Sequence, residues 1–109
     1  MGDYSGFSVL FALANSEPAG FCAWRQTSAE EAELLNLAVA PAWRRKGVAW
    51  ALLNALDRAA TGDIFLEVAE PNSGAIALYS RAGWKSVGVR PGYYLRGTVN
   101  GVVMKKRSC

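Results

Sequence analysis

Residues 39–60 read VAPAWRRKGVAWALLNALDRAA, and within this stretch an apolar strand gives way to an amphipathic helix. Pro41 lacks the N–H group that a sheet ladder needs, so a strand is expected to end before it. Beyond the basic residues, apolar side chains recur with the spacing i, i+3, i+4, i+7 and i+11, which is typical of a helix with one buried face. These positions are Ala49, Leu52, Leu53, Leu56 and Ala60. Thr61-Gly62 is expected to end the helix.

Three strands are predicted before this helix. Residues 7–13 place large apolar side chains on alternate positions, and residues 20–26 form a second apolar run. The intervening Asn15-Ser16-Glu17-Pro18 is typical of a turn, so the two runs are predicted to form a β-hairpin. A third strand is predicted over residues 33–39. The first part of the chain is therefore expected to be an antiparallel meander.

The chain after the helix continues the alternation of strand and helix. A compact apolar strand is predicted over residues 63–68, and a short helix over residues 76–82 follows the capping residues 71–73. Two closing strands are predicted over residues 84–90 and 99–105. The predicted order is βββαβαββ in a single domain spanning residues 1–109, which indicates an α+β or α/β sandwich of sheet and helix.

The composition excludes several classes of function. The 109 residues include no histidine and two cysteines, at positions 22 and 109. A Ser-His-Asp triad cannot be built without histidine, and two distant cysteines give no metal-ligand spacing, so we expect no metal and two free thiols. No apolar run approaches the roughly 18–20 residues of a membrane helix, and the first residues do not resemble a signal peptide. The expected protein is cytoplasmic, with no membrane partner.

Positive charge is concentrated in the second part of the chain. Residues 1–40 contain one arginine against five acids, whereas residues 41–109 contain eleven Lys and Arg against four acids. A basic half is suited to polyphosphate or nucleic acid, although a solvated surface would have the same composition. No aromatic stacking motif accompanies the cations, which argues against a nucleic-acid partner.

The first candidate site is the basic loop between the third strand and the long helix. A helix start exposes unpaired N–H groups and the positive end of the helix dipole, and a glycine there lets an anion approach the backbone. The loop has neither Walker A spacing nor a G-x-G-x-x-G pattern, and an ordinary surface turn remains an alternative. The residues of this candidate phosphate site are Arg44, Arg45, Lys46, Gly47, Val48 and Ala49.

The second candidate site combines Glu67, near the end of the fourth strand, with Tyr79 on the second helix. A carboxylate and a phenol that face one cleft can act as a proton acceptor and a proton donor. The alternative is that Tyr79 is an ordinary core aromatic whose hydroxyl lies at the rim.

Two ordered motifs resemble the GNAT superfamily of N-acetyltransferases. Residues 39–53 resemble its acetyl-CoA-binding motif, whose core is [QR]-x-x-G-x-[GA], and NSGAIALYSRAGW at residues 72–84 resembles N-x-x-A-x-x-L-Y-x-x-x-G-[FW]. The resemblance extends from Phe7 to Lys105. Residues 66–68 together with residues 90–94 are most similar to the ribosomal-protein alanine N-acetyltransferases.

The resemblance implies a fold and a reaction. The implied fold is α+β, with a mixed, mainly antiparallel twisted sheet flanked by helices. The implied reaction is direct transfer of an acetyl group from acetyl-CoA to a primary amine, here a protein N-terminal α-amine such as that of a ribosomal protein. It requires neither a metal nor a covalent acyl-enzyme, which leaves both cysteines without a role.

The resemblance also assigns residues to acetyl-CoA. The basic loop would hold the pyrophosphate, and the pantetheine arm would lie along the third strand at Leu37, Ala38 and Val39, where a backbone N–H polarises the thioester carbonyl. Asn72 would contact the cofactor arm, although an N-cap for the second helix explains this residue equally well.

The catalytic and acceptor residues follow from the same resemblance. Tyr79 would protonate the departing CoA thiolate, and Glu67 would act as general base through water. A phenol has a pKa of about 10 and a thiol of about 8.5, so the phenol keeps its proton near neutral pH. Tyr93 and Tyr94 would form the wall of the acceptor channel, or would simply be sheet residues on a hairpin edge.

The match to the family has two departures. The family's opening strand and two helices have no counterpart, so the apolar hairpin of residues 7–24 is expected to be partly exposed, which favours a homodimer. TVNGV at residues 98–102 lacks the acidic residue usual before the last strand. Two other functions therefore stay open: an acetyltransferase for a small amine or antibiotic, with Glu30, Glu31 and Glu33 as acceptor pocket, and a non-catalytic acyl-CoA-binding module.

Overall fold

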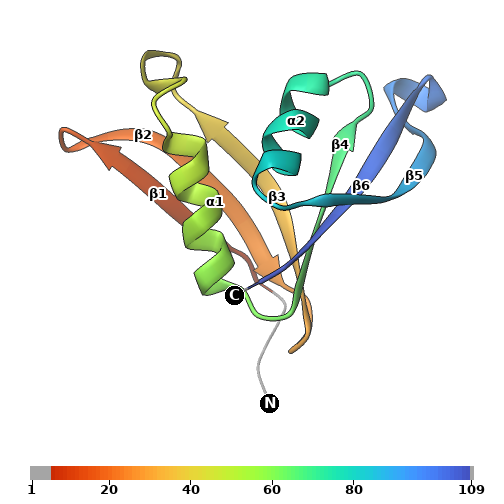
Figure 1. The fold of residues 1–109 in the computed structure, drawn as a ribbon, viewed down its shortest axis with the longest axis horizontal. Helices are drawn as coiled ribbons and strands as arrows, with labels where there is room; N and C mark the ends of the chain where they lie inside the picture. The colour runs from red at the N-terminus through yellow and green to blue at the C-terminus, as the bar shows by residue number, and fades with distance from the viewer. Residues whose placement is uncertain (1–5, 109) are drawn as a thin grey trace. The chain divides into compact units, whose positions relative to one another are not determined.

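The computed structural model describes residues 6–108, apart from the side chains of Tyr94 and Leu95. Within these residues six strands and two α-helices follow one another in the predicted order βββαβαββ (Figure 1). Two short 3-10 helices, η1 and η2, precede α1 and β6. The bounds are β1 Ser8–Ala14, β2 Glu17–Gln26, β3 Glu31–Val39, η1 Pro41–Trp43, α1 Val48–Ala59, β4 Asp63–Ala69, α2 Ser73–Arg81, β5 Lys85–Tyr94, η2 Leu95–Gly97 and β6 Val99–Arg107.

The chain divides into two compact units, Met1–Ile64 with Arg107–Cys109, and Phe65–Lys106. The single domain expected over residues 1–109 stays a prediction. None of the helices in the described part of the chain is long and apolar enough to span a bilayer.

The first unit contains the antiparallel strands β1, β2 and β3. Asn15 and Ser16 both have positive φ, 51° and 66°, which is the geometry of a two-residue hairpin turn. Because this turn is so short, β2 already begins at Glu17, and Pro18 pairs with Leu13 beside a register shift. The turn predicted over residues 15–18 was therefore too long by two residues.

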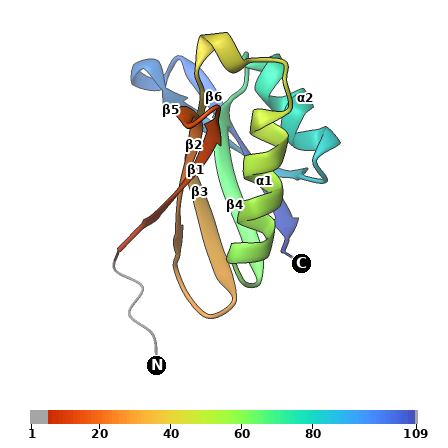
Figure 2. The ribbon, with the colours of Figure 1, turned by 90° about the vertical axis from the view of Figure 1, so that its left-hand side faces the viewer.

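Helix α1 lies against the three strands of the first unit (Figure 2). Its apolar stripe is confirmed, because Leu52, Leu53 and Leu56 are buried. A Cβ atom on Gly20 would lie 2.6 Å from the carbonyl oxygen of Ala38 and 3.2 Å from Val48 Cγ1. Glycine at this position therefore allows the close approach of β2 to its neighbours.

The other face of the hairpin is exposed, as predicted. Phe11 and Phe21 are paired across β1 and β2, with ring centroids 6.5 Å apart, and Phe21 points away from α1 because Gly20 points toward it. Four large side chains of residues 7–13 are 39–68% exposed, namely Phe7, Val9, Phe11 and Leu13. Trp50, off the buried stripe of α1, is 45% exposed. The homodimer stays a prediction.

Cys22 is a free thiol in the core of the first unit, as predicted, whereas Cys109 lies outside the described residues. Burial raises the pKa of the Cys22 thiol to about 11. At pH 8 about one thousandth of such thiols would be thiolate, the reactive form. We therefore expect a folded Cys109→Ser variant to resist a disulfide reagent, and to react with one equivalent once denatured. Rapid modification of the folded variant would contradict this burial.

The second unit contains neighbouring strands in the order β4-β6-β5, with β5 antiparallel to β6, together with α2. Its core includes Leu66, Val68, Trp84, Val102 and Met104. Helix α2 begins at Ser73, three residues before the predicted start at Ile76. The reason is the cap, because the Oδ1 atom of Asn72 accepts a hydrogen bond of 3.2 Å from the N–H of Ala75.

Candidate functional site

The basic loop of the first unit has an unusual backbone. Strand β3 ends before Pro41, as predicted, and η1 leads into exposed residues 44–47. Arg45 and Gly47 have φ of 61° and 83°, in the left-handed region. The guanidinium Nε of Arg44 donates a hydrogen bond of 3.3 Å to the carbonyl of Val39, which ties the loop to the end of β3.

The start of α1 is open to a ligand. Gly47 occupies the N-cap position, no side chain caps the helix, and the first turn contains no acidic residue. Apart from its chain neighbours, no atom in the described part of the chain lies within 4 Å of a Cβ built on Gly47. The first N–H groups of the helix and its dipole, flanked by Arg44, Arg45 and Lys46, therefore suit an anion. Val48 and Ala49 form the first turn of this helix.

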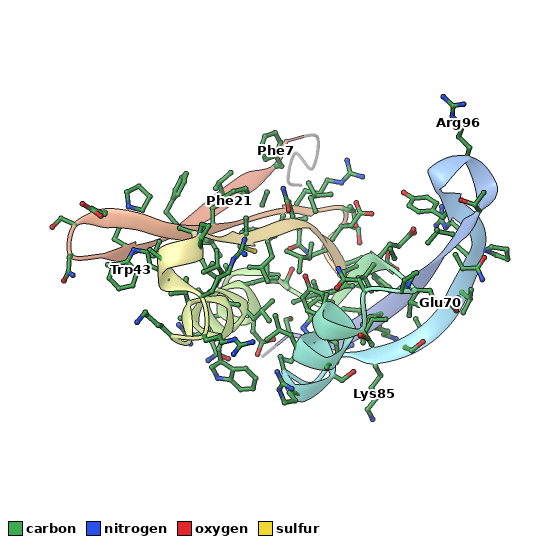
Figure 3. The ribbon with its side chains drawn as sticks, turned by 90° about the horizontal axis from the view of Figure 1, so that it is seen from above. Phe7, Phe21, Trp43, Glu70, Lys85 and Arg96 are labelled. Carbon is green, nitrogen blue, oxygen red and sulfur yellow. The ribbon has the colours of Figure 1, made fainter. Side chains whose placement is uncertain are left out.

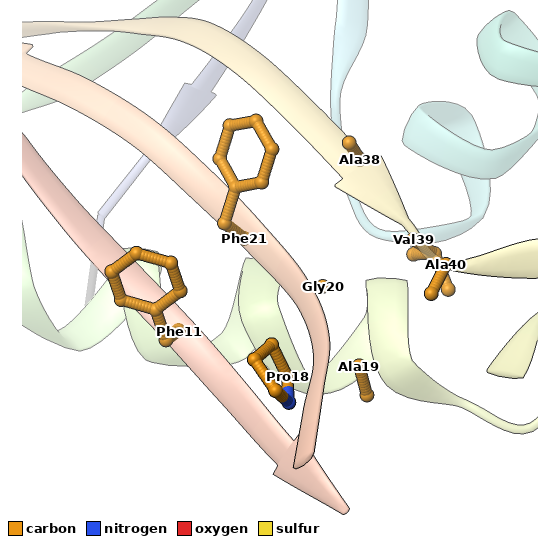
Figure 4. A pocket seen from close by; sticks show the side chains of 8 residues that line it. All are labelled: Phe11, Pro18, Ala19, Gly20, Phe21, Ala38, Val39 and Ala40. Carbon is orange, nitrogen blue, oxygen red and sulfur yellow. The ribbon is translucent and has the colours of Figure 1, made fainter.

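The end of β3 lines an apolar pocket of about 270 Å³ in the first unit (Figure 4). Ala38 and Val39 contribute to it, whereas Leu37 pairs with Cys22 on β2. Sequence patterns did not identify the other side of the pocket, which depends on the pairing of Phe21 with Ala38. The complete lining is Phe11, Pro18, Ala19, Gly20, Phe21, Ala38, Val39 and Ala40.

The alternative small-amine function assigns three acids to its acceptor pocket, and these acids have different neighbours in the structure. Glu33 forms an ion pair of 2.7 Å with Arg25. Glu30 and Glu31 instead line a polar pocket near Gly62, together with Ala29, Asp63 and Arg107. Glu33 is not among the residues that line this pocket, and the acceptor pocket of the small-amine alternative stays a prediction.

In the second unit Glu67 is paired with a cation. Oε1 of Glu67 lies 2.8 Å from Nη2 of Arg90, and the Glu67 side chain is 22% exposed. Its other oxygen, Oε2, is buried and has no hydrogen-bond partner among the described residues. The guanidinium carbon of Arg90 also lies 5.0 Å from the ring centroid of Tyr93. Sequence analysis placed Arg90 in a segment that resembles the family but gave it no role, because its contact with Glu67 depends on how β4 and β5 are arranged.

Asn100 holds the end of β5 in place. Its Oδ1 accepts a hydrogen bond of 3.0 Å from the N–H of Gly92, and its Nδ2 lies 3.4 Å from Oε1 of Glu70. Gly92 has φ of 62° and lies close to Gly97, so the chain turns tightly here. An acidic residue at position 100 would lack the donor and would face Glu70. The lack of an acidic residue at residues 98–102, noted above as a departure from the family, therefore suits the neighbouring Glu70 of this chain.

The remaining candidates in the second unit lie on α2 and β5. The ring of Tyr79 is partly buried and its centroid lies 5.9 Å from that of Trp84, at 60°. Asn72 forms the N-cap described above, so its structural role is observed while its contact with a cofactor stays a prediction. Tyr93 is 50% exposed on β5. The side chain of Tyr94 lies outside the described part.

The candidate residues thus form two groups, one in each unit. The first unit contains a helix start suited to an anion and a strand end before it, and the second contains a carboxylate, a phenol and an aromatic side chain on a strand. A helix start suited to a phosphate, together with a carboxylate and a phenol, is compatible with acyl transfer from a phosphate-bearing donor. Residues 2–84 match the sequence profile of the Acetyltransferase (GNAT) family, and the chain belongs to this family.

Named relatives lie within the same family. The chain is 37% identical over 84 residues to the [ribosomal protein bS18]-alanine N-acetyltransferase of Escherichia coli, which covers 73% of this chain and 56% of the relative. It is 34% identical over 91 residues to the N-alpha-acetyltransferase RimI of Mycobacterium tuberculosis, covering 83% and 58%. The chain thus spans little more than half the length of these curated relatives.

The fold agrees with a solved member of the family. The crystal structure of the Escherichia coli ribosomal-protein-S18-alanine N-acetyltransferase superposes with a TM-score of 0.79 at 28% identity. The match covers 94% of this chain and 70% of that one. The predicted fold class and the resemblance read from the two motifs are therefore confirmed.

Proposed function

We propose that this chain transfers the acetyl group of acetyl-CoA directly to the N-terminal α-amine of a protein. The observation that carries the proposal is the uncapped start of α1, which has no acidic residue in its first turn, within a segment that matches the acetyltransferase family. Relatives named as N-terminal acetyltransferases, one of them acting on ribosomal protein bS18, support the choice of acceptor.

The first unit supplies the basic loop and the strand end that bind acetyl-CoA. Backbone N–H groups of residues 44–49 hold the pyrophosphate, whose charge is balanced by the loop cations and the helix dipole. The pantetheine arm follows Leu37, Ala38 and Val39, and a backbone N–H of this stretch stabilises the oxyanion that forms on the thioester carbonyl. Asn72 contacts the arm in addition to its capping role.

The second unit supplies the residues that move protons. The amine nitrogen attacks the thioester carbon, a C–N bond forms, and the C–S bond breaks as the tetrahedral intermediate collapses. Glu67 accepts the proton that the amine loses, through a water molecule, and Tyr79 donates a proton to the CoA sulfur. Tyr93 and Tyr94 line the path of the acceptor peptide.

An α-amine suits this site better than a lysine side chain. The attacking amine must be neutral, and an α-amino group has a pKa of about 7.7–8.0 whereas a lysine has about 10.4. Near neutral pH a substantial fraction of α-amines is uncharged, while only about one lysine in a thousand is. A site without histidine and with one carboxylate available as base is therefore more effective on protein N-termini.

The test measures release of the CoA thiol from acetyl-CoA with three peptides. The first has a free alanine N-terminus, the second is the same peptide blocked at its N-terminus, and the third is blocked but contains an internal lysine. We expect release with the first peptide alone. Release with the third would assign the activity to lysine, and no release with any peptide, while acetyl-CoA binds, would favour a small-amine enzyme or a binding module.

A further inference from the structure

Glu67, Arg90 and Tyr93, which we call the Arg90 cluster, join a strand-end carboxylate to a residue of the proposed acceptor path. The guanidinium of Arg90 lies 2.8 Å from one oxygen of Glu67 and 5.0 Å from the centre of the Tyr93 ring. One cation therefore contacts both the proposed base and the proposed acceptor wall. Arg90 has no role in the function proposed above.

The two carboxylate oxygens of Glu67 have different surroundings. Oε1 is bound to Arg90, whereas Oε2 is buried without a hydrogen-bond partner among the residues that the structure describes. A buried carboxylate oxygen without a donor is costly in free energy, so such an atom is suited to receive a donor from a ligand. The water or amine of the incoming acceptor can supply that donor.

The far end of the cluster is also held in place. Gly92, next to Tyr93, donates its N–H to the side chain of Asn100 at 3.0 Å, and Asn100 in turn contacts Glu70. The guanidinium is planar and can bind a carboxylate and lie over an aromatic ring at once, which a lysine ammonium does less well. The side chain of Arg90 therefore links Glu67 on β4 to Tyr93 on β5.

We propose that Arg90 is a positioning residue of the acetyl acceptor site. It fixes Glu67 through Oε1 and leaves Oε2 to accept the proton of the acceptor, and it orients Tyr93 beside the acceptor path. This inference rests on the proposed function and adds to it the residue through which the base is oriented.

An ordinary surface ion pair is the competing explanation. The Arg90 side chain is 57% exposed, and exposed pairs contribute little to stability. Such a pair would leave turnover unchanged when it is removed. The two explanations therefore differ in their effect on kcat, and a stability measurement alone does not separate them.

The first test compares Arg90→Gln with Lys85→Gln, using the free-alanine peptide over a range of acetyl-CoA concentrations. Lys85 is exposed on the same strand and projects away from it (Figure 3), so the control removes one charge without touching the cluster. We expect Arg90→Gln to lower kcat by about ten- to a hundredfold, as expected when a reacting group is misplaced, with the KM for acetyl-CoA unchanged. Lys85→Gln should retain full activity, and Arg90→Lys should restore part of the loss. Full kcat in Arg90→Gln overturns the proposal.

The second test combines Arg90→Gln with Glu67→Gln. Because Arg90 acts through Glu67, the double variant should be no slower than Glu67→Gln alone. If Arg90→Gln slows the Glu67→Gln enzyme by the same factor as the wild type, Arg90 acts independently and the proposal fails. Circular dichroism verifies that each variant is folded. A wild-type chain that binds acetyl-CoA and acetylates none of the peptides overturns the proposed function, and this inference with it.

Discussion

Tyr79→Phe is expected to lower kcat for acetyl transfer by about two to four orders of magnitude, the usual contribution of a positioned general acid. The substitution removes only the hydroxyl group. The ring can keep its packing against Trp84, whose centroid lies 5.9 Å away, and the backbone of residue 79 still accepts the hydrogen bond of 2.9 Å from the N–H of Trp84. We therefore expect the variant to keep its fold and its affinity for acetyl-CoA.

The measurement pairs thiol release with calorimetric titration of acetyl-CoA. We expect the variant to bind acetyl-CoA as the wild type does while its turnover is largely lost. An unchanged kcat would falsify the assignment of Tyr79 as the acid and would favour its interpretation as an ordinary packed aromatic. A loss of binding together with turnover would instead indicate a structural defect, which a thermal melt detects.

Gly62→Ala is expected to cause a large loss of stability. Gly62 has φ of 78°, and a Cβ atom there would overlap the backbone of Glu30. The left-handed conformation costs an alanine about 1–2 kcal/mol, and overpacking adds about 1–3 kcal/mol. Together these are a large part of the stability of a small domain, so the melting temperature should fall by more than about 10 °C.

The turn around Gly62 cannot easily move to relieve this overlap. The N–H of Asp63 donates to the carbonyl of Glu30 at 2.9 Å, the N–H of Ser108 donates to the carbonyl of Gly62 at 2.9 Å, and Thr61 is bonded to Gln26. These hydrogen bonds connect the turn to Glu30, Ser108 and Gln26, all within the first unit.

Gly97→Ala is the matched control for this prediction. Gly97 has φ of 88°, and apart from its chain neighbours no atom of the described residues lies within 4 Å of its Cβ position, so the control has the backbone cost without the overlap. Thermal melts of both variants separate the two costs. Equal decreases in melting temperature in the two variants would show that the overlap with Glu30 adds nothing to the destabilisation.

The sequence by itself determined the order of elements and the family. The buried stripe of α1 repeats with a period close to that of the helix, and Pro41, Asn72 and Gly62 mark element ends through their own backbone chemistry. These signals are local, since each depends on residues within one or two turns of the chain. The two family motifs are equally local, and for that reason the amino-acid sequence alone was enough to single out the basic loop, Asn72 and Tyr79.

The tertiary structure alone decided which distant residues meet. The pairing of Phe21 with Ala38 forms the apolar pocket, Arg90 reaches Glu67 from another strand, and the backbone of Glu30 lies against Gly62. The ion pair of Glu33 with Arg25 belongs to the same class. Such contacts depend on strand register and on the packing of side chains far apart in sequence, and local periodicity contains no information about either. The sequence therefore identified the chemistry-bearing residues, and the fold decided their partners.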